Sequence, residues 1–177
     1  MQEERKRELE TRLADVPEGE LMICAEMAAP CFPPPACACI GSGEKGRLDI
    51  WPLYDGAELT LQAYSAKSVA FSHAVPAAPM LEINHCYAGR VGYTGDTGMA
   101  LYLGEGDISL HGLHTCMETV MQFPFDGYLG FSFRVDVARL DANPPDFMRE
   151  AGVCAAGILT KFCGENGFSV LSSAEQV

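Results

Sequence analysis

The segment from Leu81 to Leu110 constrains the fold most, because it holds three short apolar runs separated by turn sequences. Two alternating runs flank a Gly-Asp-Thr-Gly turn at residues 95–98, and a second glycine-rich turn at residues 104–107 leads into the third run. Alternating apolar runs around such turns are typical of antiparallel hairpins. The segment therefore predicts a twisted hairpin that continues into a further strand.

The chain on either side of this segment repeats the pattern. Short β-prone runs are separated by turn residues such as Asp55-Gly56, and the long run that begins at Leu81 contains Gly89 and Gly92 as expected bends. Strands this short at this spacing predict a jelly roll or barrel. The expected strands are Leu48–Tyr54, Ala57–Tyr64, Lys67–His73, Leu81–Thr94, Met99–Leu103, Ile108–Leu113, Cys116–Phe123 and Tyr128–Val135.

The two ends of the chain differ from this central part. A charged run free of glycine and proline predicts a helix over Gln2–Leu13, whereas residues 21–46 hold three consecutive prolines and are expected to be irregular. After residue 141, helix-start and glycine stop signals predict short helices at Asp146–Ala151 and Ala155–Phe162. The sequence therefore divides into an N-terminal helix and arm (1–46), a β-barrel (47–140) and a helical extension (141–177).

Charge and hydropathy argue against nucleic-acid binding, secretion and a membrane span. The chain has 12 Lys and Arg against 24 Asp and Glu, so its formal net charge is −12. Because phosphate backbones bind clusters of basic side chains, this chain is expected to bind nucleic acid poorly. The charged N-terminus is unlike a secretory signal, and no apolar run approaches the roughly 18 residues of a membrane span. We therefore expect a cytoplasmic protein without a membrane segment.

The eight cysteines are expected to be reduced, because no export signal accompanies them and several lie in apolar runs. Cys31, Cys37 and Cys39 could be three thiolate ligands of a zinc ion. Their spacing does not match the usual zinc-binding pairs, so apolar cysteines packed in an arm are the preferred interpretation.

Two residues carry a recognisable motif. Glu82 and Gly89 have the spacing of the Glu-x6-Gly pattern of cupin barrels, and His73 could be the histidine that precedes it. Val75 and Met117 occupy two positions where cupins commonly have metal-binding histidines. A tight metal site needs three or four convergent ligands, so a metal is not expected here.

The chain from Leu48 to Cys163 resembles the effector-sensing domain of AraC-type transcription regulators, a cupin-like barrel that usually lacks the metal. The likeness rests on residues 80–90, 101–110 and 122–124 and on the helical stretch after residue 143. It implies an all-β, cupin-like jelly roll (double-stranded β-barrel) with short helices at both ends. It also implies a dimerising domain that binds a small effector, such as a sugar or another small metabolite, with no catalytic residues and no cofactor. DNA would be bound only by a helix-turn-helix domain that this chain lacks, and the segment Phe32 to Ala38 is a candidate lid.

The candidate site follows from strand alternation. Glu82 and Asn84 share one face of their strand, which lines the barrel in a cupin, while His85 points to the other face. Arg90 could pair with Glu82 or with an anionic ligand, and a structural Glu82–Arg90 ion pair is an equal alternative. The remaining histidines lie near the expected barrel mouth. The candidate ligand-binding residues are His73, Glu82, Asn84, Arg90, His111 and His114.

Two other functions remain open. A metal-dependent cupin enzyme, either an isomerase or a dioxygenase, could use His73 and Glu82 together with His111 or His114. Alternatively, the chain is an interaction module that dimerises and binds nothing small, in which case these histidines are structural.

Overall fold

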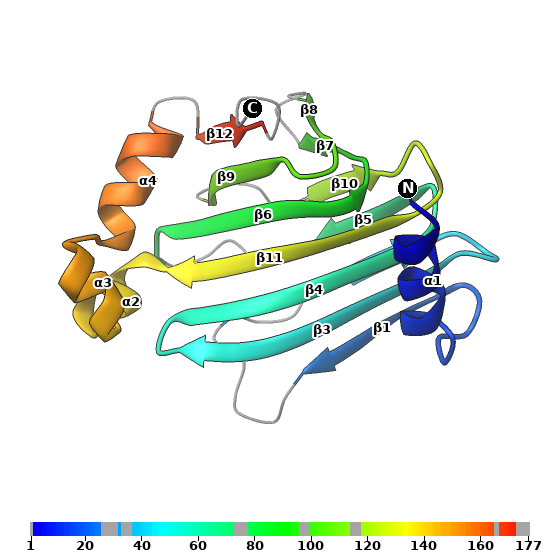
Figure 1. Cartoon of the computed structure of the whole chain (residues 1–177), viewed down its shortest axis with the longest axis horizontal. Coiled ribbons are helices and arrows are strands. Elements are labelled where there is room, and N and C mark those ends of the chain that lie inside the picture. The colour runs from blue at the N-terminus through cyan, green and yellow to red at the C-terminus, as the bar shows by residue number, and fades with distance from the viewer. Residues whose placement is uncertain are drawn as a thin grey trace.

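Two β-sheets lie one behind the other in this chain, with helices at both ends of the outer face of the larger sheet (Figure 1). The structure is a computed structural model that describes residues 2–25, 32, 37–72, 78–95, 100–113, 118–164 and 167–172. The predicted fold class is confirmed, because the chain is mainly β with short helices near both ends. Among the described residues, no helix has the length and hydropathy that a membrane span requires.

Each sheet mixes strands from distant parts of the chain. In spatial order, the seven-stranded sheet holds β1 (Glu20–Ala25), β3 (Lys45–Tyr54), β4 (Ala57–Ser65), β11 (Tyr128–Asp136), β6 (Met80–Gly89), β9 (Ile108–Leu113) and β12 (Phe168–Leu171). The five-stranded sheet holds β2 (Cys37–Ile40), β5 (Ser68–Ser72), β10 (Glu118–Gln122), β7 (Val91–Gly95) and β8 (Ala100–Leu103). The described pairings are antiparallel, apart from the parallel pair of β1 and β3.

Strand alternation divides the side chains of the larger sheet between two faces. The inner face packs against the smaller sheet in a core whose members include Ile50, Tyr64, Cys86 and Tyr128 from the larger sheet and Phe71 from the smaller one. The outer face is covered only in part, by helices at its two ends. The interior between the sheets is thus the main hydrophobic core of the fold.

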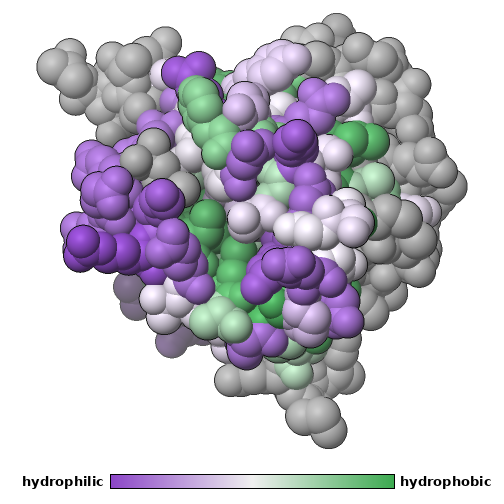
Figure 2. Space-filling model, turned by 90° about the vertical axis from the view of Figure 1, so that its right-hand side faces the viewer, coloured by the Kyte–Doolittle hydropathy of each residue, from purple (hydrophilic) through white to green (hydrophobic). Residues whose placement is uncertain are grey.

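Helices cover the two ends of the outer face. At one end lies α1 (Glu3–Arg12), and at the other lie α2 (Val137–Ala142), α3 (Asp146–Ala151) and α4 (Ala155–Cys163). Leu9 is buried on α1 and packs with Leu129 of β11. The surface at the α1 end is mostly hydrophilic, with narrow apolar bands between the charged residues (Figure 2). The narrow apolar stripe of this helix is therefore sufficient to dock it on the sheet.

Near both ends of the chain, the secondary structure differs from the expectation. β1 and β2 lie within the segment that was expected to be an irregular arm, and they add a strand to each sheet. β12 lies in the expected helical extension and pairs with β9, while α2 begins at Val137, before the expected boundary at residue 140. Residues from the expected arm and from the expected helical extension thus contribute strands to the two sheets. Backbone pairing with distant strands decided this, and local sequence does not show it.

The strands of the segment from Leu81 to Leu110 also pair differently from the expectation. Residues 96–98 of the expected turn lie outside the described residues, but the β7–β8 hairpin on its two sides is present. The turn at residues 104–107 does not continue that hairpin, because β9 pairs with β6 in the other sheet. The expected long strand from Leu81 divides after Gly89, where the chain crosses between sheets.

Candidate functional site

A row of ionisable side chains crosses the inner face of the larger sheet. Glu82 of β6 lies opposite His111 of β9 on one side and Arg134 of β11 on the other, and Arg134 lies opposite Glu58 of β4. Directly opposed residues have Cβ atoms about 4.5–5.5 Å apart, so these four side chains are immediate neighbours. They share the strand face of Cys86, which is fully buried in the core between the sheets.

Glu58 of this row is fully buried, the other three members are partly buried, and both carboxylates of the row are bonded to neighbouring side chains. Glu58 is 0% exposed and the Arg134 side chain 11%, and the two form an ion pair. The Ser132 hydroxyl donates a hydrogen bond of 2.7 Å to Oε1 of Glu82. Charged groups removed from water are stable only when they are paired and hydrogen-bonded, so this arrangement fixes the conformation of the row.

Around this row, buried polar atoms lack a hydrogen-bond partner. A buried polar group without a partner costs about 1–3 kcal/mol, which makes such a concentration unusual for a filled core. We name these residues, with Glu82, His111 and Ser132, the polar interior. Six such atoms are found among the described residues: Glu58 Oε2, Thr60 Oγ1, Gln62 Oε1, Tyr64 OH, Asn84 Nδ2 and Arg134 Nε. The buried hydroxyls of Tyr93 and Tyr128 form a hydrogen bond with each other.

Aromatic rings fill the inner face further along the same strands. Tyr64 stacks on Phe123, with ring centroids 4.9 Å apart, and both rings also stack on Tyr128. A Cβ atom at Gly130 would lie 2.1 Å from the Tyr128 hydroxyl, so only glycine fits beside it. The interior is therefore apolar at the α1 end and polar toward α2.

Glu82 influences the ionisation of its neighbours. Burial raises the pKa of Tyr93 and of Tyr64 well above the ordinary tyrosine value, and the negative charge of Glu82 adds to both effects. Burial lowers the pKa of His111, and Glu82 partly opposes this effect. The tyrosines are therefore neutral hydroxyl groups at physiological pH, and His111 is held toward its neutral form. The imidazole also shares a hydrogen bond of 2.7 Å between its Nε2 atom and Ser109 Oγ.

This environment of His111 predicts a pH-dependent stability. Because the pKa of His111 is lower in the folded chain than in the unfolded one, protonation favours unfolding as the pH falls through about 6.5. Replacing His111 with Gln is expected to remove that part of the loss, so the native chain should lose more stability than the variant between about pH 7 and pH 5. Urea unfolding of both proteins across this range measures it. Parallel stability curves would contradict the burial of a neutral imidazole.

Three of the predicted site residues meet in the polar interior. Glu82, Asn84 and His111 share the inner face, and Asn84 is 2% exposed between Ser109 and Ser132 on the neighbouring strands. The other two histidines of the predicted set, His73 and His114, lie outside the described residues. His85 points to the outer face as expected, with its ring stacked on Phe131 at 6.3 Å.

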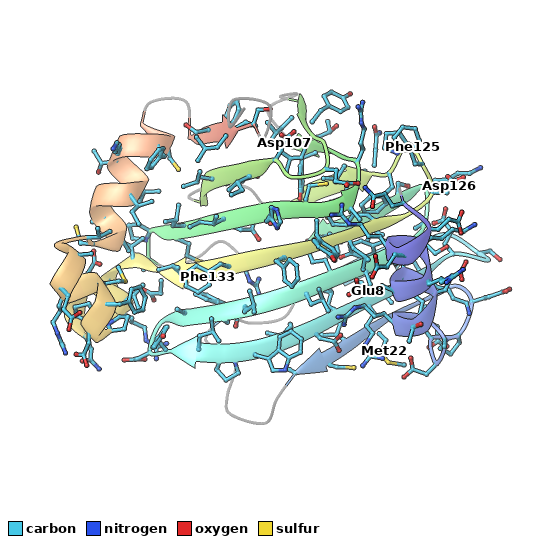
Figure 3. All side chains as sticks on the ribbon, in the orientation of Figure 1. Glu8, Met22, Asp107, Phe125, Asp126 and Phe133 are labelled. Carbon is cyan, nitrogen blue, oxygen red and sulfur yellow. The ribbon has the colours of Figure 1, made fainter. Side chains whose placement is uncertain are left out.

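The position of Arg90 differs from the sequence prediction. It is exposed beyond the end of β6, and its guanidinium lies 5.8 Å from the centre of the Phe125 ring. Eight residues of extended strand span about 27 Å, so Arg90 cannot reach Glu82 although the two share a strand parity. Figure 3 labels Phe125 near the α1 end and Phe133, whose strand partner is Ile83, toward the opposite end. The alternative in which Glu82 and Arg90 form an ion pair is wrong, and the cation beside Glu82 is Arg134.

Sequence reasoning missed several members of the polar interior. Glu58, Thr60 and Gln62 alternate along β4, and Ser132 and Arg134 alternate along β11. Polar residues at every second position are normally assigned to solvent, so the pattern alone did not mark them. One signal could have marked them. The positions between these polar residues are mostly apolar, so the strands had reason to be buried on both faces.

Metal and cysteine chemistry depends largely on residues that are not described. Among the described side chains, no group of three or more His, Cys, Asp and Glu could hold a metal ion. Cys24, Cys86, Cys154 and Cys163 have free thiols, and burial raises the pKa of Cys86 to about 12. Cys31 and the side chains of Cys37 and Cys39 are not described, so the zinc alternative is untested.

A hollow lies on the outer face, between the larger sheet and the helices α2–α4. It has a volume of about 230 Å³ and exposes only apolar atoms, with Phe133, Leu140 and Phe147 among its lining residues. It offers no hydrogen-bonding group that could orient a polar molecule. The polar interior is therefore the better candidate site for polar ligands.

Comparison with known proteins gives a likeness to cupins. No family model and no curated protein matches the chain. A Cupin 2 conserved barrel domain protein from Salinispora arenicola is 20% identical over 55% of this chain and 81% of its own, with a TM-score of 0.40. An RmlC-like cupin protein from Desulfovibrio desulfuricans is 11% identical over 50% of this chain and 80% of its own, also with a TM-score of 0.40. The AraC-like transcriptional activator CuxR is 12% identical over 67% of this chain but only 41% of its own, with a TM-score of 0.36. Because these identities and TM-scores are low, we infer the function from the geometry of the interior.

Proposed function

We propose that this chain is a ligand-binding regulatory domain that holds a small polar molecule between its two sheets. The observation that carries the proposal is the group of buried polar atoms without partners on the inner face, which includes Glu58 Oε2, Asn84 Nδ2 and Arg134 Nε at or beside the Glu82–Arg134–Glu58 row. Small-molecule sites combine apolar walls with a few convergent polar groups of this kind. A hydroxylated or amide-bearing metabolite would supply the missing donors and acceptors. The proposed role is regulatory and not catalytic.

The regulatory step would depend on the N-terminal segment. Phe32, the one described residue between positions 26 and 36, is buried, and its ring lies 5.4 Å from the Arg134 guanidinium. A ligand beside Arg134 would therefore favour one placement of Phe32 over another. It can shift that equilibrium only by its difference in affinity for the two placements.

The output is proposed from the resemblance to AraC-type regulators. In that scheme the chain is a cytoplasmic sensor that forms a homodimer, and a helix-turn-helix domain outside this chain contacts DNA. The net charge of −12 is consistent with a domain that does not bind DNA itself.

The ligand-binding proposal is tested by replacing Asn84 with Leu. This substitution keeps the number and branching of the side-chain heavy atoms but removes the amide, whose Nδ2 atom is buried without a partner. The variant is expected to stay folded, and to lose at least about tenfold in affinity for any polar metabolite that stabilises the native chain. A thermal-shift screen of sugars, polyols and amino compounds identifies the metabolite, and calorimetric titration measures the affinity.

The matched control is His85→Gln, because His85 lies one residue along the same strand on the outer face. It should leave the affinity unchanged. If Asn84→Leu binds as tightly as the native chain, or if no metabolite stabilises the chain, the polar interior is not the ligand site.

A further inference from the structure

The cationic side chains of the chain can all be placed, because all 12 Lys and Arg lie at described positions. Arg134 lies on the inner face between the sheets. The other eleven lie on helices, on the outer face, or at exposed turns and strand ends: Arg5, Lys6, Arg7, Arg12, Lys45, Arg47, Lys67, Arg90, Arg139, Arg149 and Lys161. The interior therefore contains one permanent cation.

That one cation is already engaged. Glu58 forms the ion pair with a terminal nitrogen of Arg134, and the Phe32 ring lies over the guanidinium carbon at 5.4 Å. Only Nε of the guanidinium is buried without a partner. An incoming anion would thus have to compete with a carboxylate for Arg134.

The carboxyl groups of the interior outnumber its cations. Glu58 and Glu82 stand against Arg134, while His111 is shifted toward its neutral form by burial. The surplus is accompanied by buried polar atoms directed at the same space: Glu58 is 0% exposed with a free Oε2, and Asn84 is 2% exposed with a free Nδ2. These free atoms distinguish the cluster from an acidic patch that serves only structure.

We propose, on the basis of the proposed ligand site, that the polar interior selects neutral and cationic molecules and rejects anions. The favoured ligand class bears hydroxyl, amide, ammonium or amidinium donors, and carboxylates and phosphates are excluded. In a medium of low dielectric constant, repulsion between like charges a few ångströms apart is much stronger than in water. A cationic donor, by contrast, would gain a charge-assisted hydrogen bond to Glu82 or to the free oxygen of Glu58.

Three small probes of nearly the same shape test this selectivity: acetate, acetamide and acetamidinium. Saturation-transfer NMR with the folded native chain is expected to show binding of acetamidinium and acetamide but not of acetate. In Glu82→Gln, the affinity for acetamidinium should fall by about tenfold, and that for acetamide should change by less than about threefold. His85→Gln, on the outer face, should behave like the native chain.

The outcomes separate this inference from the function on which it rests. Acetate binding that is lost in Asn84→Leu would overturn the selectivity and leave the ligand site standing. If no probe binds the native chain better than Asn84→Leu, the ligand site itself fails, and the selectivity fails with it. An unchanged affinity for acetamidinium in Glu82→Gln would also contradict the selectivity.

Discussion

Replacing Arg134 with Met is expected to lower the free energy of unfolding by about 3–5 kcal/mol. The substitution leaves Glu58, which is 0% exposed, as an unpaired carboxylate in the core between the sheets. Breaking one side of a buried ion pair costs far more than the pair itself contributes, because the remaining charge has lost its only strong partner. Urea unfolding of the native chain and the variant, followed by circular dichroism, measures the difference.

Two controls make this prediction specific to burial. The Arg139–Asp55 pair has both side chains about half exposed, so Arg139→Met should cost less than about 1 kcal/mol. The double variant Glu58→Leu/Arg134→Met should recover most of the lost stability, because it removes both buried charges. If Arg134→Met and Arg139→Met lower the free energy of unfolding equally, the placement of the row between the two sheets is contradicted.

Gly89→Ala is expected to have the second largest effect on stability. Gly89 ends β6 with φ +90°, and a Cβ atom there would lie 2.3 Å from the carbonyl oxygen of Gly127. The conformational strain costs about 1–3 kcal/mol, and the clash with backbone, which cannot rotate away, adds a similar amount. The expected loss in unfolding free energy, measured by urea denaturation, is therefore about 2–6 kcal/mol.

Gly152→Ala is the matched control for this substitution. Gly152 also has a positive φ, +64°, but no atom lies within 4 Å of the position that a Cβ would take. Its variant should lose only the conformational contribution of about 1–2 kcal/mol. If both variants lose the same amount, close packing at the corner between β6 and β7 is not the reason for glycine at position 89.

Local sequence patterns predicted the strands well because they reflect local physics. The limits of β9 and α3 match the expected ranges, and the alternation along β6 placed Glu82 and Asn84 on the inner face correctly. Alternation assigns a face but not a partner, so the alternative in which Glu82 and Arg90 form an ion pair is wrong. Arg134 is Glu82's true neighbour because β11 and β6 pair in one particular register.

Pairing between distant strands is also what the sequence could not show at the ends of the chain. β1 and β12 are short edge strands whose partners, β3 and β9, lie elsewhere in the sequence. The polar residues of β4 were hidden for a related reason: Glu58, Thr60 and Gln62 look like a solvent-facing stripe until the second sheet covers them. The candidate site is therefore a product of the two-sheet arrangement, and local patterns show only part of it.

Chemical-shift mapping with acetamidinium tests the central claim, a ligand site between the two sheets, most directly. The probe is titrated into the ¹⁵N-labelled chain, and the backbone amide signals are followed. A ligand site between the sheets predicts concentration-dependent shifts concentrated at Glu58, Glu82, Asn84, Ser132 and Arg134. Shifts confined to the outer hollow around Phe133 and Phe147, or no shifts at all, would contradict it.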